Sequence, residues 1–248
     1  MKTPFILRRA FQAMIPAVLL LASCGKDDDP ATPAPDQGRV TFVNAAAGVG
    51  ATVAVKYSVN TVEKAQLTYG QASGYQGIDV GAPVFKTTVA SSGQAINEDA
   101  GIIAKNGSYS YFLYNITPTT YGSLLKTDDL TAPTSGKAKI RLVHLGNGIS
   151  TSINLSTVLP VGYAAIISSV NFGSASDFIE VNPGPFSMAI TTGTSMNPLA
   201  GLQVGDGTGT GTGTKTLVAG KIYTVLVRGV DTLFDPALKA KVFVYENN

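Results

Sequence analysis

The chain of 248 residues contains one cysteine, Cys24, one histidine, His144, and no tryptophan. A single cysteine excludes a disulfide within the chain. One cysteine and one histidine also fall short of the several ligands that zinc and other transition metals require. A Ser–His–Asp or Cys–His catalytic arrangement would have to use His144, which lies in an apolar run typical of a strand. We therefore predict no catalytic residues, no metal site and no cofactor.

Charge is also sparse, because only 14% of the residues are Asp, Glu, Lys or Arg. Of the 18 Lys and Arg residues, three lie before Cys24 (Lys2, Arg8 and Arg9), which leaves 15 against 16 Asp and Glu in the rest of the chain. This remainder is close to neutral and has no basic stripe. Binding to nucleic acid, which depends on neutralising phosphates, is therefore not expected.

The N-terminus has the parts of an export signal. Lys2, Arg8 and Arg9 precede a short apolar run over residues 11–21, which is too short to remain as a membrane span. The run ends in Leu21-Ala22-Ser23-Cys24, which resembles the lipobox of bacterial lipoproteins. The resemblance implies cleavage of residues 1–23 and attachment of lipid to Cys24. The alternative is an ordinary signal peptide with a chance cysteine.

The residues after the cysteine carry a second signal. Lys26, Asp27, Asp28 and Asp29 resemble the short acidic motif that sends lipoproteins of Bacteroidota-type bacteria to the cell surface; the alternative is a solvated charge cluster that begins a linker. Residues 24–38 are rich in proline and have no apolar periodicity, as expected of a tether. We therefore expect a protein anchored by lipid to the outer membrane and exposed at the surface.

The rest of the chain contains an internal duplication. Four apolar segments recur in the same order, about a hundred residues apart. The matched pairs are 40–45 with 140–145, 69–75 with 172–178, 83–85 with 185–186, and 107–113 with 220–226. We therefore predict two tandem domains, residues 39–130 and 137–248, joined by a short connector.

Both copies have the composition and periodicity of strands. Thr, Val, Gly, Ser and Tyr are abundant, and turn residues interrupt the apolar segments every eight to twelve positions. Residues 52–58 alternate Val53, Val55 and Tyr57 with smaller or polar residues, which indicates a half-buried strand. Residues 111–114 and 223–227 are apolar on both faces, so we expect central strands there. The fold class predicted is all-β, with two tandem antiparallel β-sandwich domains.

A family resemblance supports the same architecture. The motif [Tyr/Phe]-Gly-x-Ala-Ser-x-[Tyr/Phe] at 69–75 and 172–178, and the junction that leads through Thr127-Asp128-Asp129-Leu130 into Ile140-Arg141-Leu142-Val143-His144, are similar to the domain-of-unknown-function family number 4397. The resemblance covers residues 38–248. It implies immunoglobulin-like sandwiches and a cell-envelope location, and it implies no activity or functional residues.

Few residues suggest a site. Glycoside hydrolysis needs two facing carboxylates, and the candidates are Asp128-Asp129, Glu98-Asp99 and scattered single carboxylates, all of which we expect to be solvated turn residues. The Gly-Thr run at 207–214 lacks the lysine and the strand-to-helix setting of a phosphate loop, so a hairpin loop is expected there. Tyrosines concentrate in the first copy, and Tyr57, Tyr69 and Tyr75 are the candidate ligand contacts; the alternative is ordinary packing.

These observations favour a non-catalytic binding or adhesion protein. Its expected partners are the membrane, through the lipid anchor, and an unknown glycan or protein ligand. The first alternative is a structural accessory subunit of an envelope complex. The second alternative is a glycoside hydrolase that uses carboxylates alone.

Overall fold

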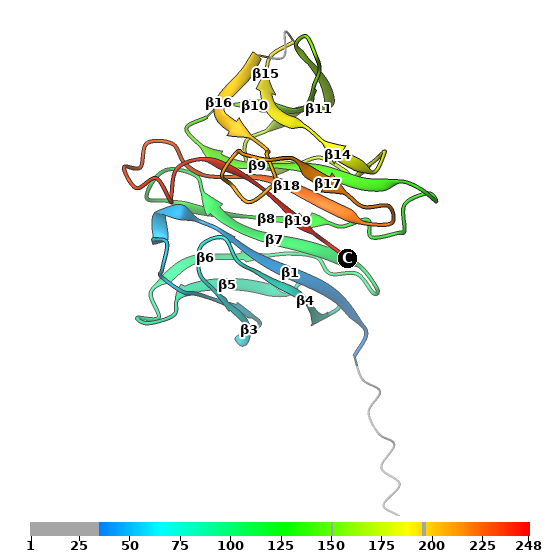
Figure 1. Ribbon diagram of the computed structural model, residues 1–248. Coiled ribbons are helices and arrows are strands. Elements are labelled where there is room, and N and C mark those ends of the chain that lie inside the picture. The colour runs from blue at the N-terminus through cyan, green and yellow to red at the C-terminus, as the bar shows by residue number, and fades with distance from the viewer. Residues whose placement is uncertain (1–34, 150, 195–196) are drawn as a thin grey trace, which may run out of the picture. The chain divides into compact units, whose positions relative to one another are not determined.

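The computed structural model describes residues 35–149, 151–194 and 197–248. Cys24 and Lys26, Asp27, Asp28 and Asp29 therefore lie outside the described residues. Apart from one 3₁₀ turn, η1 (Ala47–Val49), every regular element among the described residues is a strand (Figure 1). The all-β prediction is confirmed. In the described part of the chain, no helix is long and apolar enough to cross a membrane.

The first eight strands form two facing four-stranded sheets. They are β1 (Gln37–Ala45), β2 (Val55–Val59), β3 (Val62–Leu67), β4 (Ala72–Asp79), β5 (Val84–Val89), β6 (Ala95–Ala100), β7 (Ser108–Asn115) and β8 (Tyr121–Thr127). One sheet has the order β4-β1-β7-β8 and the other β3-β2-β5-β6. On β2 the alternating Val55, Tyr57 and Val59 are buried between the sheets, which confirms the half-buried strand predicted there, although it begins at residue 55.

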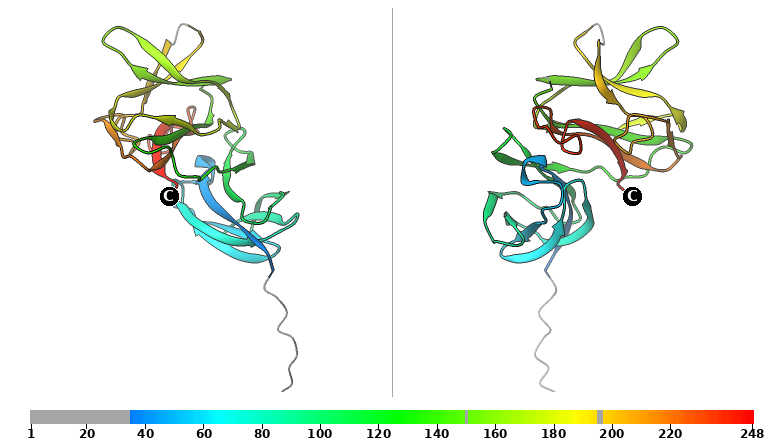
Figure 2. Two further views of the ribbon diagram at one scale, coloured as in Figure 1. Left: turned by 90° about the vertical axis from the view of Figure 1, so that its right-hand side faces the viewer. Right: turned by 60° about the vertical axis from the view of Figure 1, so that its left-hand side comes forward.

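The remaining strands repeat this plan with more breaks. They are β9 (Ala138–Asn147), β10 (Ser152–Val158), β11 (Tyr163–Asn171), β12 (Ser174–Ala175), β13 (Ile179–Val181), β14 (Gly184–Phe186), β15 (Met188–Thr192), β16 (Asn197–Gln203), β17 (Lys215–Leu217), β18 (Ile222–Val230) and β19 (Lys241–Glu246). One sheet has the order β12-β9-β18-β19, with β13 also on β9, and the facing sheet has the order β11-β10-β15-β16. A two-stranded sheet pairs β14 with β17. Figure 2 shows the two groups of layered strands in further views.

The central strands of the two halves pair in the same way. β1 runs parallel to β7 with Val40 opposite Tyr109, and β9 runs parallel to β18 with Ile140 opposite Tyr223. Each of these tyrosines accepts a hydrogen bond at its hydroxyl from the backbone N–H five residues earlier, at 3.0 and 3.1 Å. This contact resembles the tyrosine corner of immunoglobulin-like sandwiches. The strand order differs from the constant-type immunoglobulin order, since the first strand lies between the fourth and the seventh.

The repeated Gly-x-Ala-Ser motif has a structural role that both copies share. The pairing of β1 with β4 shifts register between Thr41 and Val43, so the N–H of Phe42 lacks a backbone partner on that side. The Ser73 hydroxyl accepts this N–H at 3.0 Å. In the second copy, the Ser176 hydroxyl accepts the N–H of Leu142 at the same distance. The motif therefore satisfies a backbone donor where the ladder is interrupted.

The equivalent sheets of the two copies pack against each other through a small apolar cluster. Its buried members are Val43, Ala45, Phe112, Val143, Leu145 and Leu226. Residues Pro35–Asn248 accordingly form one compact unit. In the described chain no sheet mixes strands of the two copies, but the domain boundaries at 39–130 and 137–248 stay a prediction.

The glycine of the repeated motif leaves space in which a side chain of the other copy packs. A Cβ on Gly70 would lie 2.5 Å from the Arg228 guanidinium, and a Cβ on Gly173 would lie 2.8 Å from the Tyr114 hydroxyl. Arg228 stacks over the Tyr69 ring at 4.2 Å, and Tyr114 meets the Phe172 ring edge-on at 5.7 Å. The contact is therefore reciprocal, as in an isologous dimer interface.

Candidate functional site

The structure separates the three tyrosines that the sequence suggests as ligand contacts. Tyr57 is 1% exposed and packs against the Phe42 and Tyr111 rings, so the prediction of a ligand contact is wrong for this residue. Its inward position on β2 follows from the alternation of the strand. Tyr69 is half-buried under the Arg228 guanidinium.

Tyr75 is also half-buried, and its hydroxyl is engaged by a buried carboxylate. Its hydroxyl donates to Asp128 Oδ2 at 2.6 Å. Burial, followed by the negative charge of Asp128, raises the pKa of Tyr75 well above its usual value. The three tyrosines therefore do not share one exposed surface.

Asp128 is a buried ion-pair partner, and our expectation of a solvated turn residue is wrong for it. Its Oδ1 accepts from the Arg141 guanidinium at 2.6 Å, and both side chains are 0% exposed. Arg141 also donates to the hydroxyls of Ser110 and Thr224, each at 2.8 Å. Burial of both charges is tolerated because all three guanidinium nitrogens and both carboxylate oxygens form hydrogen bonds.

The other candidate pairs of carboxylates are likewise engaged separately. Asp129 forms an ion pair with Lys139 at 2.8 Å, away from the Arg141 contact of its neighbour. Glu98 pairs with Lys86 across β5 and β6, whereas Asp99 accepts from the hydroxyls of Tyr111 and Ser123. Neighbours on a strand point to opposite faces, so Glu98 and Asp99 do not face a common substrate.

His144 is buried within β9 and is 0% exposed. Its ring meets the Phe172 ring edge-on at 5.6 Å. A general base must reach a proton on the substrate, and a fully enclosed imidazole has no such access in this conformation. Among the described residues, no group of three His, Cys, Asp or Glu side chains could hold a metal ion.

One carboxylate differs from all the others. Of the thirteen Asp and Glu residues in the described ranges, twelve accept a hydrogen bond or form an ion pair. Asp231 is the exception, because no hydrogen bond or ion pair within the described part of the chain engages its carboxylate. In the sequence Asp231 is one of the scattered single carboxylates, and Asp231-Thr232-Leu233 resembles a short O-glycosylation motif of Bacteroidota-type bacteria.

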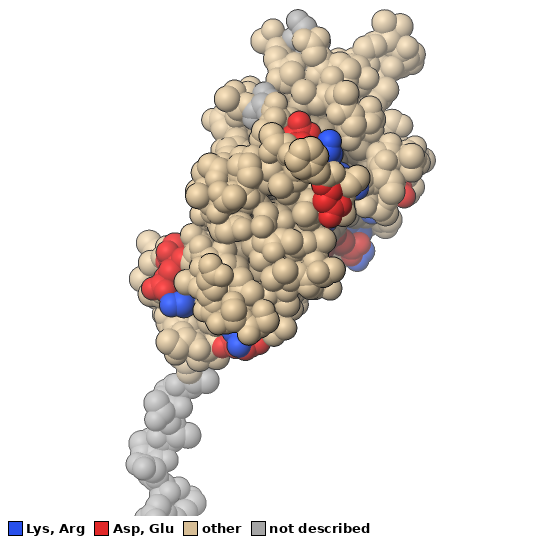
Figure 3. All heavy atoms as spheres, turned by 90° about the vertical axis from the view of Figure 1, so that its left-hand side faces the viewer, with Lys and Arg blue, Asp and Glu red and all other residues tan. Residues whose placement is uncertain are grey.

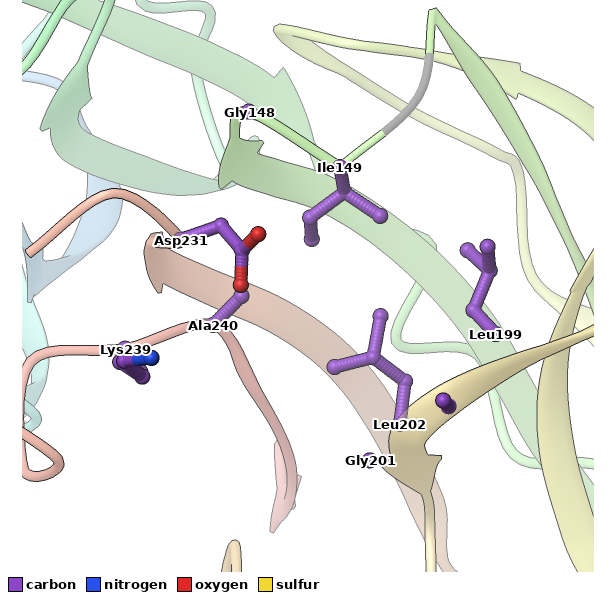
Figure 4. A pocket seen from close by; sticks show the side chains of 9 residues that line it. Gly148, Ile149, Leu199, Gly201, Leu202, Asp231, Lys239 and Ala240 are labelled. Carbon is purple, nitrogen blue, oxygen red and sulfur yellow. The ribbon is translucent and has the colours of Figure 1, made fainter.

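Asp231 lines a hollow in the second copy with a volume of about 330 Å³ (Figure 4). The apolar side comes from Ile149, Leu199 and Leu202, and the polar side from Asp231 and Lys239. Gly148, Ala200, Gly201 and Ala240 complete the lining. The volume lies within the usual range of small-molecule sites.

The parallel pairing of β9 and β18 assembles this hollow. Val230 lies opposite Asn147 at the C-terminal ends of these strands, so Asp231 and Gly148, which follow them, meet at this end of the two central strands. The N–H of Asp231 donates to the Asn147 carbonyl at 3.0 Å and fixes this junction. Leu199 and Leu202 of β16 approach from the facing sheet. Sequence reasoning missed this assembly because its residues come from four separate segments.

The hollow has the chemistry of a binding site. Apolar side chains opposite a free carboxylate and an ammonium group suit a small ligand with an apolar face and several hydroxyl or amino groups. On the face drawn in Figure 3, charged side chains gather in a few small groups with wide uncharged surface between them.

The Gly-Thr run forms the expected loop, between β16 and β17, and it lies along β19. The N–H of Val244 donates to the Gly207 carbonyl at 2.8 Å, and Thr208 forms a bridge with Phe243. Within the run, the Thr208 hydroxyl donates to Asp206 Oδ1 at 2.6 Å. These contacts assign a packing role to the run.

Comparisons with known proteins give one family and a distant structural likeness. No curated protein matches the chain. One similar solved structure is CBMbc (family CBM26) from Eubacterium rectale Amy13K in complex with maltoheptaose, at 12% identity over 86% of this chain and 97% of that chain. Its TM-score of 0.23 is too low to carry an argument about the present chain. Residues 51–153, from before β2 into β10, match the family described as domain of unknown function (DUF4397), and the resemblance seen in the sequence is thereby confirmed over this segment.

Proposed function

We propose that the chain is a non-catalytic binding protein of the bacterial cell envelope. Lipid on Cys24 holds it at the outer membrane, and Lys26 to Asp29 direct it to the cell surface. The Asp231 hollow binds a small ligand or an exposed part of a larger one, of which a glycan is the first class to test. The apolar run before Cys24 and the proline-rich residues after it support the anchor and the tether.

The free carboxylate of Asp231 carries the binding part of this proposal. An ionised carboxylate accepts strong hydrogen bonds, and almost every other one in the described chain does so within the protein. Asp231 instead stands at the rim of a hollow opposite Ile149 and Leu199. Sugars fit this pattern, since they offer an apolar ring face and hydroxyl donors to a carboxylate.

The test is a glycan array probed with the mature protein, followed by titration of each hit. We expect Asp231→Asn and Leu199→Ala to weaken binding, by roughly tenfold or more for loss of a charged hydrogen-bond acceptor. Glu63→Gln is the matched control, because Glu63 is an exposed carboxylate of the first copy that pairs only with exposed Lys56. Binding that survives both hollow variants, or that Glu63→Gln weakens equally, would place the ligand elsewhere.

A second function has its own supporting observation. The turn between β10 and β11 exposes Val158, Leu159 and Val161, the last at 90%. Exposed apolar side chains at a hairpin tip suit docking to a protein partner. A structural subunit of an envelope complex would yield a stable partner on crosslinking from a Val161→Cys probe, and it would bind no free glycan.

A further inference from the structure

The outer face of the first copy ends in a patch made only of apolar residues. On this face of the paired strands β5 and β6, Lys86 and Glu98 form an ion pair with 2.8 Å between Nζ and Oε2. Beyond this pair the face carries only aliphatic side chains. We name these residues the apolar end patch: Val80, Ala82, Val84, Ala100, Ile102 and Ala104.

The pairing of the backbone places the patch residues on one face. Val84 lies opposite Ala100, and Gly81 forms an antiparallel bridge with Ile103. Side chains alternate along paired strands, so Ile103 points inward and its neighbours point outward. The exposures agree, since Ile103 is 1% exposed and Ile102 is 77% exposed. Val80 and Val84 are 43% and 41% exposed.

The turn after β2 borders the patch beside Val84. Asn60 is joined to Val84 by two hydrogen bonds of 2.9 Å, one through its backbone N–H and one through its side-chain oxygen. Exposed valine and isoleucine side chains in one contiguous area mark a surface that another apolar phase covers.

The N-terminal segment enters the fold at the edge of this patch. The N–H of Val80 donates to the Asp36 carbonyl at 3.0 Å, and Lys105 pairs with the Asp36 carboxylate at 2.8 Å. Asn106 donates its N–H to the Gln37 carbonyl at 2.9 Å. Asp36 is therefore held between two segments that border the apolar end patch.

The length of chain before Asp36 keeps the patch close to the proposed lipid. Eleven residues separate Cys24 from Asp36. Even fully extended, this stretch reaches only about 40 Å. A tether of this length confines the folded part near the bilayer and holds the local concentration of the patch beside the lipid high.

We propose that the apolar end patch rests against the lipid surface to which the chain is anchored. This inference depends on the proposed anchor at Cys24. Contact with lipid removes the side chains of Ile102, Val80 and Val84 from water, which is favourable for aliphatic groups. The ion pairs Lys105–Asp36 and Lys86–Glu98 border the patch and remain at the level of the headgroups. Docking in this way turns the first copy toward the membrane.

The experiment uses the mature lipidated protein reconstituted into phosphatidylcholine vesicles. Cys24 is the only natural cysteine, and its thiol is consumed by lipid, so an introduced cysteine can be labelled alone. Ile102→Cys carries an environment-sensitive fluorophore at the patch. Ser91→Cys is the matched control, because Ser91 is exposed in the turn after β5, at the opposite end of the same strand.

We expect the Ile102 label to emit at shorter wavelength on vesicles and to be quenched by nitroxide lipids, while the Ser91 label stays aqueous. Val80→Asp in the Ile102→Cys background should reverse the shift. The protein could float with the vesicles while both labels emit as they do in water. This result would overturn the docking and leave the anchor intact. Failure to float at all would refute the anchor, and the docking with it. The emission shift of the Ile102 label could instead increase with the amount of protein per vesicle and be insensitive to nitroxide lipids. That result would show that a second copy of the protein, and not lipid, covers the patch.

Discussion

The Asp128–Arg141 ion pair should dominate the stability of the contact between the two copies. Asp128→Asn removes the negative charge and leaves the Arg141 guanidinium buried without a counter-ion. Both side chains are 0% exposed, so water cannot replace the lost partner in this conformation. Removal of one member of such a pair costs about 3–5 kcal/mol. This is a large share of the roughly 5–15 kcal/mol that stabilises a typical domain.

Replacement of both charges should cost less than replacement of one. The double variant Asp128→Leu with Arg141→Met leaves no isolated charge, although the hydroxyls of Tyr75, Ser110 and Thr224 then lose partners. Unsatisfied buried hydroxyls cost about 1–3 kcal/mol each at most, and some can turn toward other acceptors. We therefore expect the double variant to be more stable than Asp128→Asn.

The free energy of unfolding of the mature protein, measured in urea for all variants, tests this reasoning. Lys126→Met is the control, because it breaks an ion pair with Asp177, whose side chain is 91% exposed. Loss of this exposed pair should lower the free energy of unfolding by less than about 1 kcal/mol. A loss below about 1 kcal/mol for Asp128→Asn would refute the argument from burial. A double variant less stable than the single one would show that the hydrogen bonds outweigh the charge.

Two further predictions concern backbone geometry and pH. Gly173→Ala should lower the free energy of unfolding by about 1–3 kcal/mol, because its φ is +77° and the new Cβ would meet the Tyr114 hydroxyl; thermal unfolding measures the loss. Hydrogen bonds from Lys139 and then Thr131 lower the pKa of Asp129 to about 2. Because this value lies below that of the unfolded chain, the stabilisation is present above about pH 4 and is lost as the pH falls toward 2.

Each of these predictions has a control within the chain. Gly74→Ala has a similar φ of +70° with nothing near the new Cβ, so a loss equal to that of Gly173→Ala would assign the whole effect to strain. Asp129→Asn should flatten the acid limb of the plot of urea midpoint against pH. An unchanged acid limb in this variant would contradict the role of Asp129.

The sequence predicts the strands well because their periodicity is a local property. β7 and β18, apolar on both faces, are central strands as expected. The matched opening segments fall on β1 and β9 with the same register toward their parallel neighbours. What the sequence does not contain is the pairing between copies. Asp128 was expected to be a solvated turn residue, yet it pairs with Arg141 in the interior.

The candidate site was beyond sequence reasoning for a related reason. The residue type of Tyr57 suggests a ligand contact, but its side of β2 faces the core. Asp231 differs from the other described carboxylates only in its lack of a hydrogen-bond or ion-pair partner within the described chain, which depends on the three-dimensional fold. The hollow beside it joins the ends of β9 and β18 to β16 and to the start of β19, which no local pattern connects.

The central claim is a binding protein held by lipid at the cell surface, and protease shaving of intact cells tests it most directly. The comparison is between the native protein and Cys24→Ala, with an antibody to the second copy as the readout. We predict that the native protein is lost from intact cells and that the variant is absent from their surface. Protection of the native protein until the outer membrane is broken would contradict the surface location assigned to Lys26 to Asp29.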